Sequence, residues 1–135
     1  MPRPSIELIR SRELTDRVPY AYAAVARDVS RLVYTAGACP LDEAGVVAAV
    51  GDVAGQATLA MANLVAAPRA AGAGLTDVVK TTIYVASSRR EDLVTAWDVV
   101  RSQFGEHDAP STLLGVAILG YPDQLVEIEA IAALR

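Results

Sequence analysis

The sequence predicts an α+β domain in which two helices cover one face of a mostly antiparallel or mixed sheet. The prediction rests on the order of the segments. Strand-like runs come first, followed by a helix, a strand, a second helix and two apolar runs that flank a turn. The 135 residues are most simply one domain, residues 1–135, because a chain of this length buries roughly two thirds of its unfolded surface. Two helices leave the other sheet face uncovered, so we expect self-association there.

The N-terminal part of the chain supplies the first strands. Residues 5–10 alternate apolar and polar side chains, which is typical of a half-buried strand. Residues 11–20 are polar and predict a loop, and residues 22–29 predict a short edge strand. Residues 31–37 predict a further strand because they are rich in β-branched and aromatic side chains, and residues 40–45 predict a turn-rich loop.

The first helix begins after Asp52, whose carboxylate suits the N-cap position. Gly72 lies where the helix should stop. Pro68 has no amide N–H, and an interior proline costs about 3 kcal/mol, so we expect a kink or an early end near Ala67. Apolar side chains recur on one face at helical spacing; they are Val53, Ala57, Ala60, Met61 and Leu64.

A strand and a second helix follow. Residues 78–85 predict the strand, since they are rich in Val, Thr, Ile and Tyr. Ser88 and Glu91 are spaced as a capping box for the helix, and Gly105 lies at its end. The apolar stripe of this helix consists of Leu93, Trp97, Val100 and Phe104.

Two apolar runs of strand length end the chain, at residues 112–119 and 125–134. Turn-forming residues 120–123 separate them, which predicts a β-hairpin. In the second run, Val126, Ile128 and Ala130 share one face, and Leu125, Glu127, Glu129 and Ile131 share the other. Carboxylates flanked by Leu and Ile need a partner or a function, so we look for the site on this strand.

Composition and charge exclude several classes of protein. The net charge is −4 and no basic cluster alternates with aromatic residues, so we expect no nucleic-acid partner. No apolar run approaches the roughly 18–20 residues of a membrane span, and the N-terminus lacks the apolar core of a signal peptide. The single cysteine, Cys39, cannot form an intramolecular disulfide, so we expect a cytoplasmic protein. With His107 as its only histidine, the chain predicts no metal site.

Several segments together resemble the RidA/YjgF family, most specifically an Asp-Val-Val-Lys-Thr-Thr run and a Val-Glu-Ile-Glu-Ala run at their proper separation. The segments that carry the resemblance are residues 18–20, 33–42, 51–53, 63–64, 71–73, 77–82 and 125–130. The resemblance implies the chorismate-mutase-like fold, a six-stranded mixed sheet backed by two helices. It also implies a homotrimer with small-molecule clefts between its subunits. Members hydrolyse enamine or imine intermediates to keto acids and ammonia without a bound cofactor; an older label is endoribonuclease.

The resemblance also assigns roles to individual residues. Glu127 matches the catalytic glutamate that positions the attacking water, and Tyr20 matches a tyrosine that lines the cleft. Ala36 stands where many members carry a serine. Ser111 falls where the family has an arginine that binds the substrate carboxylate, and Thr112 follows it in the same pattern. We therefore expect Tyr20, Ala36, Ser111 and Thr112 to contact the ligand.

The serine at position 111 is the main departure from the family. Leaving a partly buried carboxylate without its arginine should cost about 2–5 kcal/mol, which is roughly 30-fold to several thousand-fold in affinity or rate. Either another residue supplies the positive charge, or the ligand is not an amino-acid-derived carboxylate. Arg89, Arg90 and Arg101 are candidates, although we expect all three to be solvated surface charges.

Two functions remain open at this point. The first is a trimer that hydrolyses a small carbonyl- or imine-type metabolite with Glu127. The second is a non-catalytic ligand-binding or protein-interacting trimer that has lost deaminase chemistry with the family arginine. RNA cleavage fits poorly with the acidic balance. We expect Cys39 to be a buried small hydrophobe, His107 to be solvated, and Glu129 to be a structural residue near the sheet edge.

Overall fold

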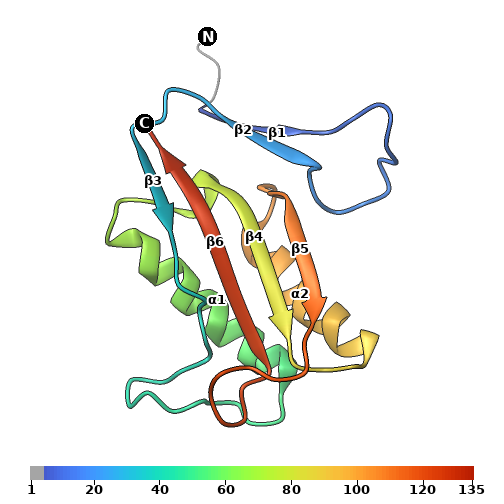
Figure 1. Cartoon of the computed structure of the whole chain (residues 1–135), viewed down its shortest axis with the longest axis vertical. Coiled ribbons are helices and arrows are strands. Elements are labelled where there is room, and N and C mark those ends of the chain that lie inside the picture. The colour runs from blue at the N-terminus through green and yellow to red at the C-terminus, as the bar shows by residue number, and fades with distance from the viewer. Residues whose placement is uncertain (1–4) are drawn as a thin grey trace.

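Two helices pack on one face of a four-stranded sheet in the computed structural model, which describes residues 5–135 (Figure 1). The α+β class is therefore confirmed. The elements are β1 (Ile6–Ile9), β2 (Ala23–Ala26), β3 (Arg31–Tyr34), α1 (Val53–Arg69), a 3-10 turn (Leu75–Asp77), β4 (Val78–Val85), α2 (Arg90–Phe104), β5 (Ser111–Gly115) and β6 (Val126–Leu134).

The four-stranded sheet has the order β3-β6-β4-β5 and is mixed. Strand β6 runs antiparallel to both β3 and β4, whereas β4 and β5 are parallel and are joined through α2. Strands β1 and β2 pair only with each other and lie beyond one end of the main sheet in Figure 1. The six expected strands are thus present but are divided between two sheets. The chain turns sharply after β2, where Asp28 has a φ of +55°, and this turn separates β2 from β3.

The C-terminal hairpin prediction is wrong. Strand β4 lies between β5 and β6, so the two apolar runs are never paired. A strand that follows a crossover helix pairs in parallel with the strand before that helix, and β5 does so with β4. The connection to β6 then passes around the end of β4: Val116 N–H donates to the Val85 carbonyl, and Ala86 N–H donates to the Leu125 carbonyl, each at 2.8 Å. Strand β6 is therefore a central strand.

The core lies between the helices and the inner face of the sheet. Met61 and Leu64 from α1, Val100 from α2, and Ile83 and Ile128 from the sheet are all fully buried. Burying each such side chain contributes about 1.5–3 kcal/mol, which is ample reason for the helices to cover this face. The predicted alternation along β6 is confirmed, because Val126, Ile128 and Ala130 are buried and the intervening residues are half-buried.

The first helix starts where predicted; of the two outcomes expected at Pro68, a kink or an early end near Ala67, the early end is not observed. The Asp52 carboxylate accepts a hydrogen bond from Gly55 N–H at 3.0 Å, as expected of an N-cap. The helix continues through Pro68 to Arg69, beyond the early end expected near Ala67. Pro68 lies buried in the last turn, and its carbonyl accepts hydrogen bonds from Ala71 and Ala73 beyond the helix. These hydrogen bonds satisfy the carbonyl where the helix ends.

The second helix is capped differently from the prediction. Its N-cap residue is Arg89, whose side chain makes no cap hydrogen bond, and Ser87 lies two residues before it. The Ser87 hydroxyl accepts from Arg89 N–H at 3.0 Å and donates to the Asp92 carboxylate at 2.7 Å. The prediction of a capping box formed by Ser88 and Glu91 is therefore wrong. Gly105, with a φ of +62°, ends the helix as predicted. Within residues 5–135, neither helix is long and apolar enough to span a membrane.

Candidate functional site

Glu127 lies on the sheet face that the helices leave uncovered. It is the second residue of β6 and is half-buried, opposite Tyr84 of the neighbouring strand β4. The side chains before and after it, Val126 and Ile128, point into the core. The alternation of the strand therefore forces Glu127 onto the open face.

The side chain of Glu127 is held through one of its two oxygens. Its Oε1 atom accepts a hydrogen bond from the Cys39 thiol at 3.2 Å and another from the Gln124 amide at 3.1 Å. Gln124 is only 4% exposed, and its own orientation is fixed because it donates to the Val126 carbonyl and accepts from Tyr121 N–H. With Oε1 occupied by two donors, Oε2 is the oxygen left to accept a hydrogen bond from a ligand or a water molecule.

The absence of a side chain at Gly37 leaves the space that the Glu127 carboxylate occupies. A β-carbon on Gly37 would lie 2.2 Å from Glu127 Oε2, far inside van der Waals contact, so any larger residue would force the Glu127 side chain to move. The extended segment around Gly37 is tied to β6 by hydrogen bonds between Ala38 and Ile128. Ala36, predicted to contact the ligand, directly precedes Gly37 and is exposed.

Cys39 is not the buried small hydrophobe that we expected. It is half-buried, and its thiol is a donor to the candidate catalytic carboxylate. Burial, followed by the hydrogen bond and the negative charge of Glu127, raises the pKa of the Cys39 thiol to about 11. The thiol is therefore neutral and able to donate at physiological pH. No spacing pattern in the sequence could have paired residues 39 and 127; only the fold brings them together.

Glu129 lies in the middle of the open face and not near the sheet edge, because β6 is a central strand. The Tyr84 hydroxyl donates to its carboxylate at 2.7 Å, and this hydrogen bond is the main reason that the pKa of Tyr84 is raised. Glu129 lines a cavity of about 170 Å³ together with Lys80 and neighbouring residues. The Lys80 ammonium donates to the Thr112 hydroxyl at 2.6 Å, so Thr112 also points to the open face.

A groove of about 440 Å³ lies along the free edge of β5. Three predicted ligand contacts line it: Tyr20, Ser111 and Thr112, together with Pro19, Trp97 and Leu113. The rings of Tyr20 and Trp97 meet edge to face with centroids 6.4 Å apart. The aromatic rings give this groove a largely apolar wall with hydroxyl groups at its floor.

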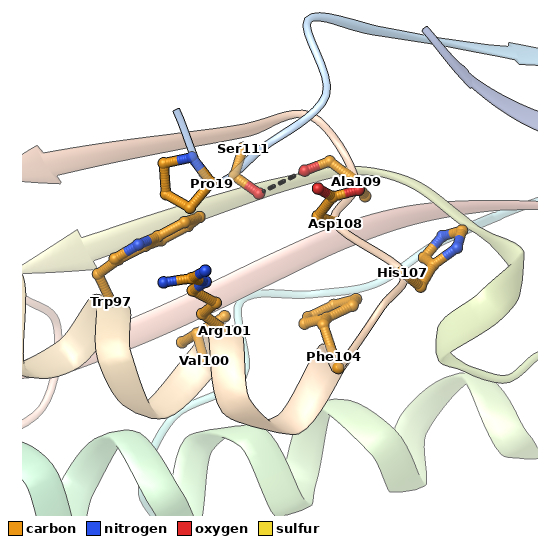
Figure 2. A pocket seen from close by; sticks show the side chains of 10 residues that line it. Pro19, Trp97, Val100, Arg101, Phe104, His107, Asp108, Ala109 and Ser111 are labelled. Carbon is orange, nitrogen blue, oxygen red and sulfur yellow. Dashed lines mark hydrogen bonds between the residues drawn. The ribbon is translucent and has the colours of Figure 1, made fainter. Parts of the chain in front are cut away.

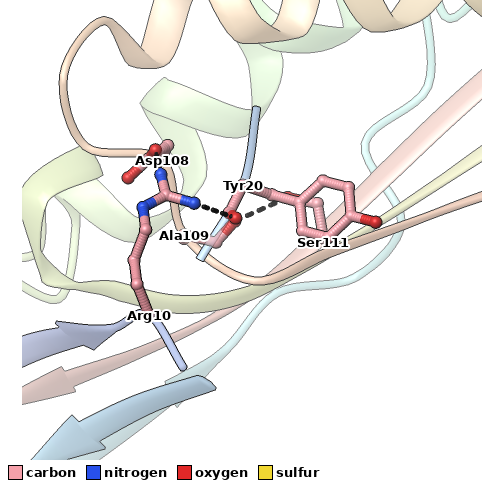
Figure 3. A network of polar contacts seen from close by, with 5 residues as sticks. All are labelled: Arg10, Tyr20, Asp108, Ala109 and Ser111. Carbon is pink, nitrogen blue, oxygen red and sulfur yellow. Dashed lines mark hydrogen bonds and ion pairs between the residues drawn. The ribbon is translucent and has the colours of Figure 1, made fainter. Parts of the chain in front are cut away.

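The Ser111 hydroxyl makes two hydrogen bonds within its own chain. It donates to the Ala109 carbonyl at 2.9 Å (Figures 2 and 3). It also lies 2.6 Å from the Thr81 hydroxyl. Thr81 is buried and faces the helices, so Ser111, its neighbour across the parallel pair, faces the same way. Ser111 therefore stabilises the start of β5 and carries no charge to the groove.

A smaller cavity adjoins the groove on the helix side and shares Pro19, Trp97 and Ser111 with it (Figure 2). Arg101 and His107 also line it. His107 is half-buried and not solvated as we expected, because its Nε2 atom lies 2.8 Å from the Val78 carbonyl.

A single arginine ties the N-terminal segment to this region. Arg10 reaches both the carboxylate of Asp108 and the carbonyl of Tyr20 (Figure 3). Ala21 N–H also donates to the Asp108 carbonyl at 2.8 Å. These contacts set the loop that carries Pro19 and Tyr20 against the edge of the main sheet.

The predicted site residues thus form two groups within one chain. Tyr20, Ser111 and Thr112 meet along β5, whereas Glu127 lies on the open face beside the segment that carries Ala36. Strand β4 separates the two groups, and no described cavity is lined by both Tyr20 and Glu127. Within residues 5–135, no three His, Cys, Asp or Glu side chains are placed to hold a metal ion.

Comparisons with known proteins give consistent results. A family model described as Endoribonuclease L-PSP matches residues 12–134. The 2-iminobutanoate/2-iminopropanoate deaminase of Salmonella typhimurium is 34% identical over 126 residues, which cover 90% of this chain and 95% of that protein. The putative reactive intermediate deaminase TdcF of Escherichia coli is 33% identical over 123 residues, covering 87% and 92%.

Solved structures agree in fold. The structure of a protein of unknown function of the Rid family, YyfB from Yersinia pestis, has a TM-score of 0.84 at 27% identity and covers 97% of this chain and 100% of its own. The structure of E. coli TdcF with bound serine has a TM-score of 0.67 at 30% identity, covering 96% and 99%.

Proposed function

The chain belongs to the RidA/YjgF/L-PSP family, and on that premise we propose that it hydrolyses small imine or enamine metabolites in clefts between the subunits of a homotrimer. The observation that carries the proposal is how the two carboxylate oxygens of Glu127 are hydrogen-bonded. One carboxylate oxygen is fixed by two donors, and the other is open beside a glycine that leaves room for it. Relatives named as deaminases of 2-iminobutanoate and 2-iminopropanoate support this reaction class.

The reaction needs a water molecule and a place for its proton. Water attacks the carbon of the C=N bond, and the nitrogen takes up a proton to give a carbinolamine. Loss of ammonia then breaks the C–N bond and leaves the carbonyl product. Glu127 Oε2 would accept the hydrogen bond that orients the attacking water, while Cys39 and Gln124 hold Oε1 in place.

The separation of the two residue groups supports a cleft shared between copies. If the groove of Tyr20 and Ser111 in one copy meets the Glu127 face of another, each cleft contains both groups. The open face is suited to such a contact because it carries exposed apolar side chains, including Leu32 and Tyr34. A closed ring of copies then gives every cleft the same composition.

The direct test is ammonia release from freshly generated 2-iminopropionate. Glu127→Gln keeps the size of the side chain and removes its charge, so it should abolish most of the activity while leaving the fold intact. A matched control is Glu43→Gln, an exposed carboxylate in the loop before α1. Absence of activity in the natural protein, or activity that survives Glu127→Gln, would count against the catalytic proposal.

Mixing two inactive variants tests the shared cleft. Tyr20→Ala damages one group and Glu127→Gln damages the other, so each variant alone should be inactive. After the two are unfolded together and refolded, random mixed trimers should contain some clefts with both natural residues, and about a quarter of the natural activity should return. No recovery in a mixture that forms trimers would show that each site lies within one chain.

A second function is favoured by one specific observation. The Ser111 hydroxyl is engaged with Thr81 and Ala109, so β5 offers no cation at the position where the family has its arginine. The protein would then bind a small ligand without hydrolysing it. Ser111→Arg discriminates the two functions: if the variant gains deaminase activity that the natural protein lacks, the cleft is intact and the natural protein is a binding protein.

A further inference from the structure

Arg101 occupies an unusual position among the arginines of the chain. It lies in the last turn of α2 and lines the small cavity beside Ser111 and Trp97. Figure 2 shows its side chain rising from the helix between Trp97 and Phe104, toward the strand that carries Ser111. Trp97, Phe104 and Ser111 line the same cavity. Arg101 is exposed, as we expected, and it also borders this cavity.

Two other polar side chains that line this cavity already have partners. Asp108 lines the same cavity, but Arg10 binds its carboxylate. The imidazole of His107 is hydrogen-bonded to the Val78 carbonyl. Among residues 5–135, Arg101 takes part in none of the ion pairs. It therefore carries an uncompensated positive charge beside an apolar wall.

The remaining candidate arginines do not share this position. Arg89 lies at the opposite end of α2 and pairs loosely with Glu91, at 3.9 Å, where both side chains are largely exposed. Arg90 is exposed like Arg101, but it lines none of the described cavities. Arg101 is thus the only one of the three that shares a cavity with Ser111.

The adjoining groove indicates the shape and polarity of an anion that Arg101 could bind. Trp97 and Pro19 line both the small cavity and the larger groove, so the two adjoin each other. The groove presents the rings of Tyr20 and Trp97 and has room for the body of a small molecule. A ligand that fits both parts combines an apolar body with a negatively charged end.

We propose that Arg101 is a specificity-determining residue that binds the carboxylate of a ligand whose apolar body lies in the groove between Tyr20 and Trp97. The guanidinium supplies two parallel N–H donors to the carboxylate, which no serine hydroxyl can offer. That the groove forms part of a catalytic cleft rests on the proposed function; binding of the carboxylate does not. The proposal narrows the substrate to apolar acids and their imines.

The test uses 3-phenylpropionate, an apolar carboxylate that cannot be hydrolysed, and 3-phenylpropionamide, its uncharged counterpart. Trp97 is the only tryptophan of the chain, so its fluorescence reports occupancy of the groove. The natural protein should bind the carboxylate more tightly than the amide. Arg101→Gln should weaken carboxylate binding about tenfold and leave amide binding unchanged. Arg90→Gln, at the start of the same helix, is the matched control and should change neither.

Each alternative outcome overturns the proposal. Saturable carboxylate binding that is unaffected by Arg101→Gln would place the cation elsewhere. An equal loss in Arg90→Gln would reduce the effect to overall charge, and absence of binding by the natural protein would remove the site. Circular dichroism of each variant checks its fold. The probe is unreactive, so binding and hydrolysis are tested separately. If the protein binds 3-phenylpropionate but releases no ammonia from 2-iminopropionate, the proposed hydrolysis alone is refuted. If it releases ammonia but Arg101→Gln does not change carboxylate binding, this inference alone is refuted.

Discussion

The thiol of Cys39 lies 3.2 Å from Glu127 Oε1 and donates a hydrogen bond to it. The two residues are 88 positions apart and meet because the segment after β3 runs alongside β6. The contact links a reactive group that can be measured directly to the candidate catalytic carboxylate. The state of Cys39 therefore reports on Glu127 whether or not the substrate is known.

Removing the negative charge at position 127 should lower the pKa of the Cys39 thiol from about 11. Burial is the largest cause of the raised pKa and remains in Glu127→Gln, so the value should stay above the ordinary 9.0. The measurement is the rate of alkylation by iodoacetamide as a function of pH, since only the thiolate reacts. Cys39 is the only cysteine, so the signal is unambiguous. An unchanged profile would mean that the thiol and the carboxylate are not in contact.

The same pKa predicts how stability depends on pH. The folded protein keeps the thiol proton up to about pH 11, whereas the unfolded chain loses it near 9.0. The thiol's contribution to the free energy of unfolding is therefore complete below pH 9.0 and is lost as the pH rises to about 11. In urea titrations, the natural protein should lose stability relative to Cys39→Ser across this window. Parallel curves for the two proteins would contradict the prediction.

Gly37→Ala should displace Glu127. The new β-carbon would lie 2.2 Å from Glu127 Oε2, so the carboxylate has to move away from its place beside Cys39. We expect a loss of about 1–3 kcal/mol in stability from the forced contact and a large loss of ammonia release. Gly120→Ala is the matched control, because a β-carbon there meets nothing within 4 Å. If both variants behave alike, the packing of Gly37 against Glu127 has no functional role.

The sequence alone correctly predicted the features that a local pattern of residues determines. The alternation along residues 125–134 correctly placed Glu127 and Glu129 on the face opposite the core, and Asp52 caps α1 as its side chain predicts. Family membership followed from short motifs spread along the whole chain, each of which is weak alone.

The sequence alone did not predict the features that depend on pairing between distant segments of the chain. Two adjacent apolar runs predict a hairpin, yet β4 is inserted between β5 and β6 because α2 makes a parallel crossover. For the same reason Glu129 was expected near an edge and lies in the centre. The contact of Cys39 with Glu127, and the shared cavity of Arg101 and Ser111, depend on segments that only the fold brings together.

Gln56→Leu should destabilise the loop that positions Gln124. Gln56 is fully buried in α1; its amide donates to the Asp123 carbonyl at 2.9 Å, and its oxygen accepts from Leu125 N–H at 2.7 Å. Leucine has a similar size but leaves these backbone groups without partners, at a cost of about 1–3 kcal/mol. Urea unfolding at a fixed protein concentration measures the loss. Gln103→Leu, on the exposed face of α2, should be nearly neutral, and equal midpoints for both variants would contradict the role of Gln56.

Tyr34→Asp should weaken self-association. Tyr34 is 69% exposed on the open face and lies opposite Ile131 of β6, so a neighbouring copy on this face would bury its ring. A charge there has to be desolvated without a partner, which should weaken association at least about tenfold and shift the protein toward the monomer. Sedimentation velocity over a range of concentrations measures the shift. Val46 is 59% exposed in the loop before α1, and Val46→Asp should leave the mass unchanged. If the natural protein sediments as a monomer, or if Tyr34→Asp keeps the natural mass, the open face is not where the copies meet, and the shared cleft loses its structural basis.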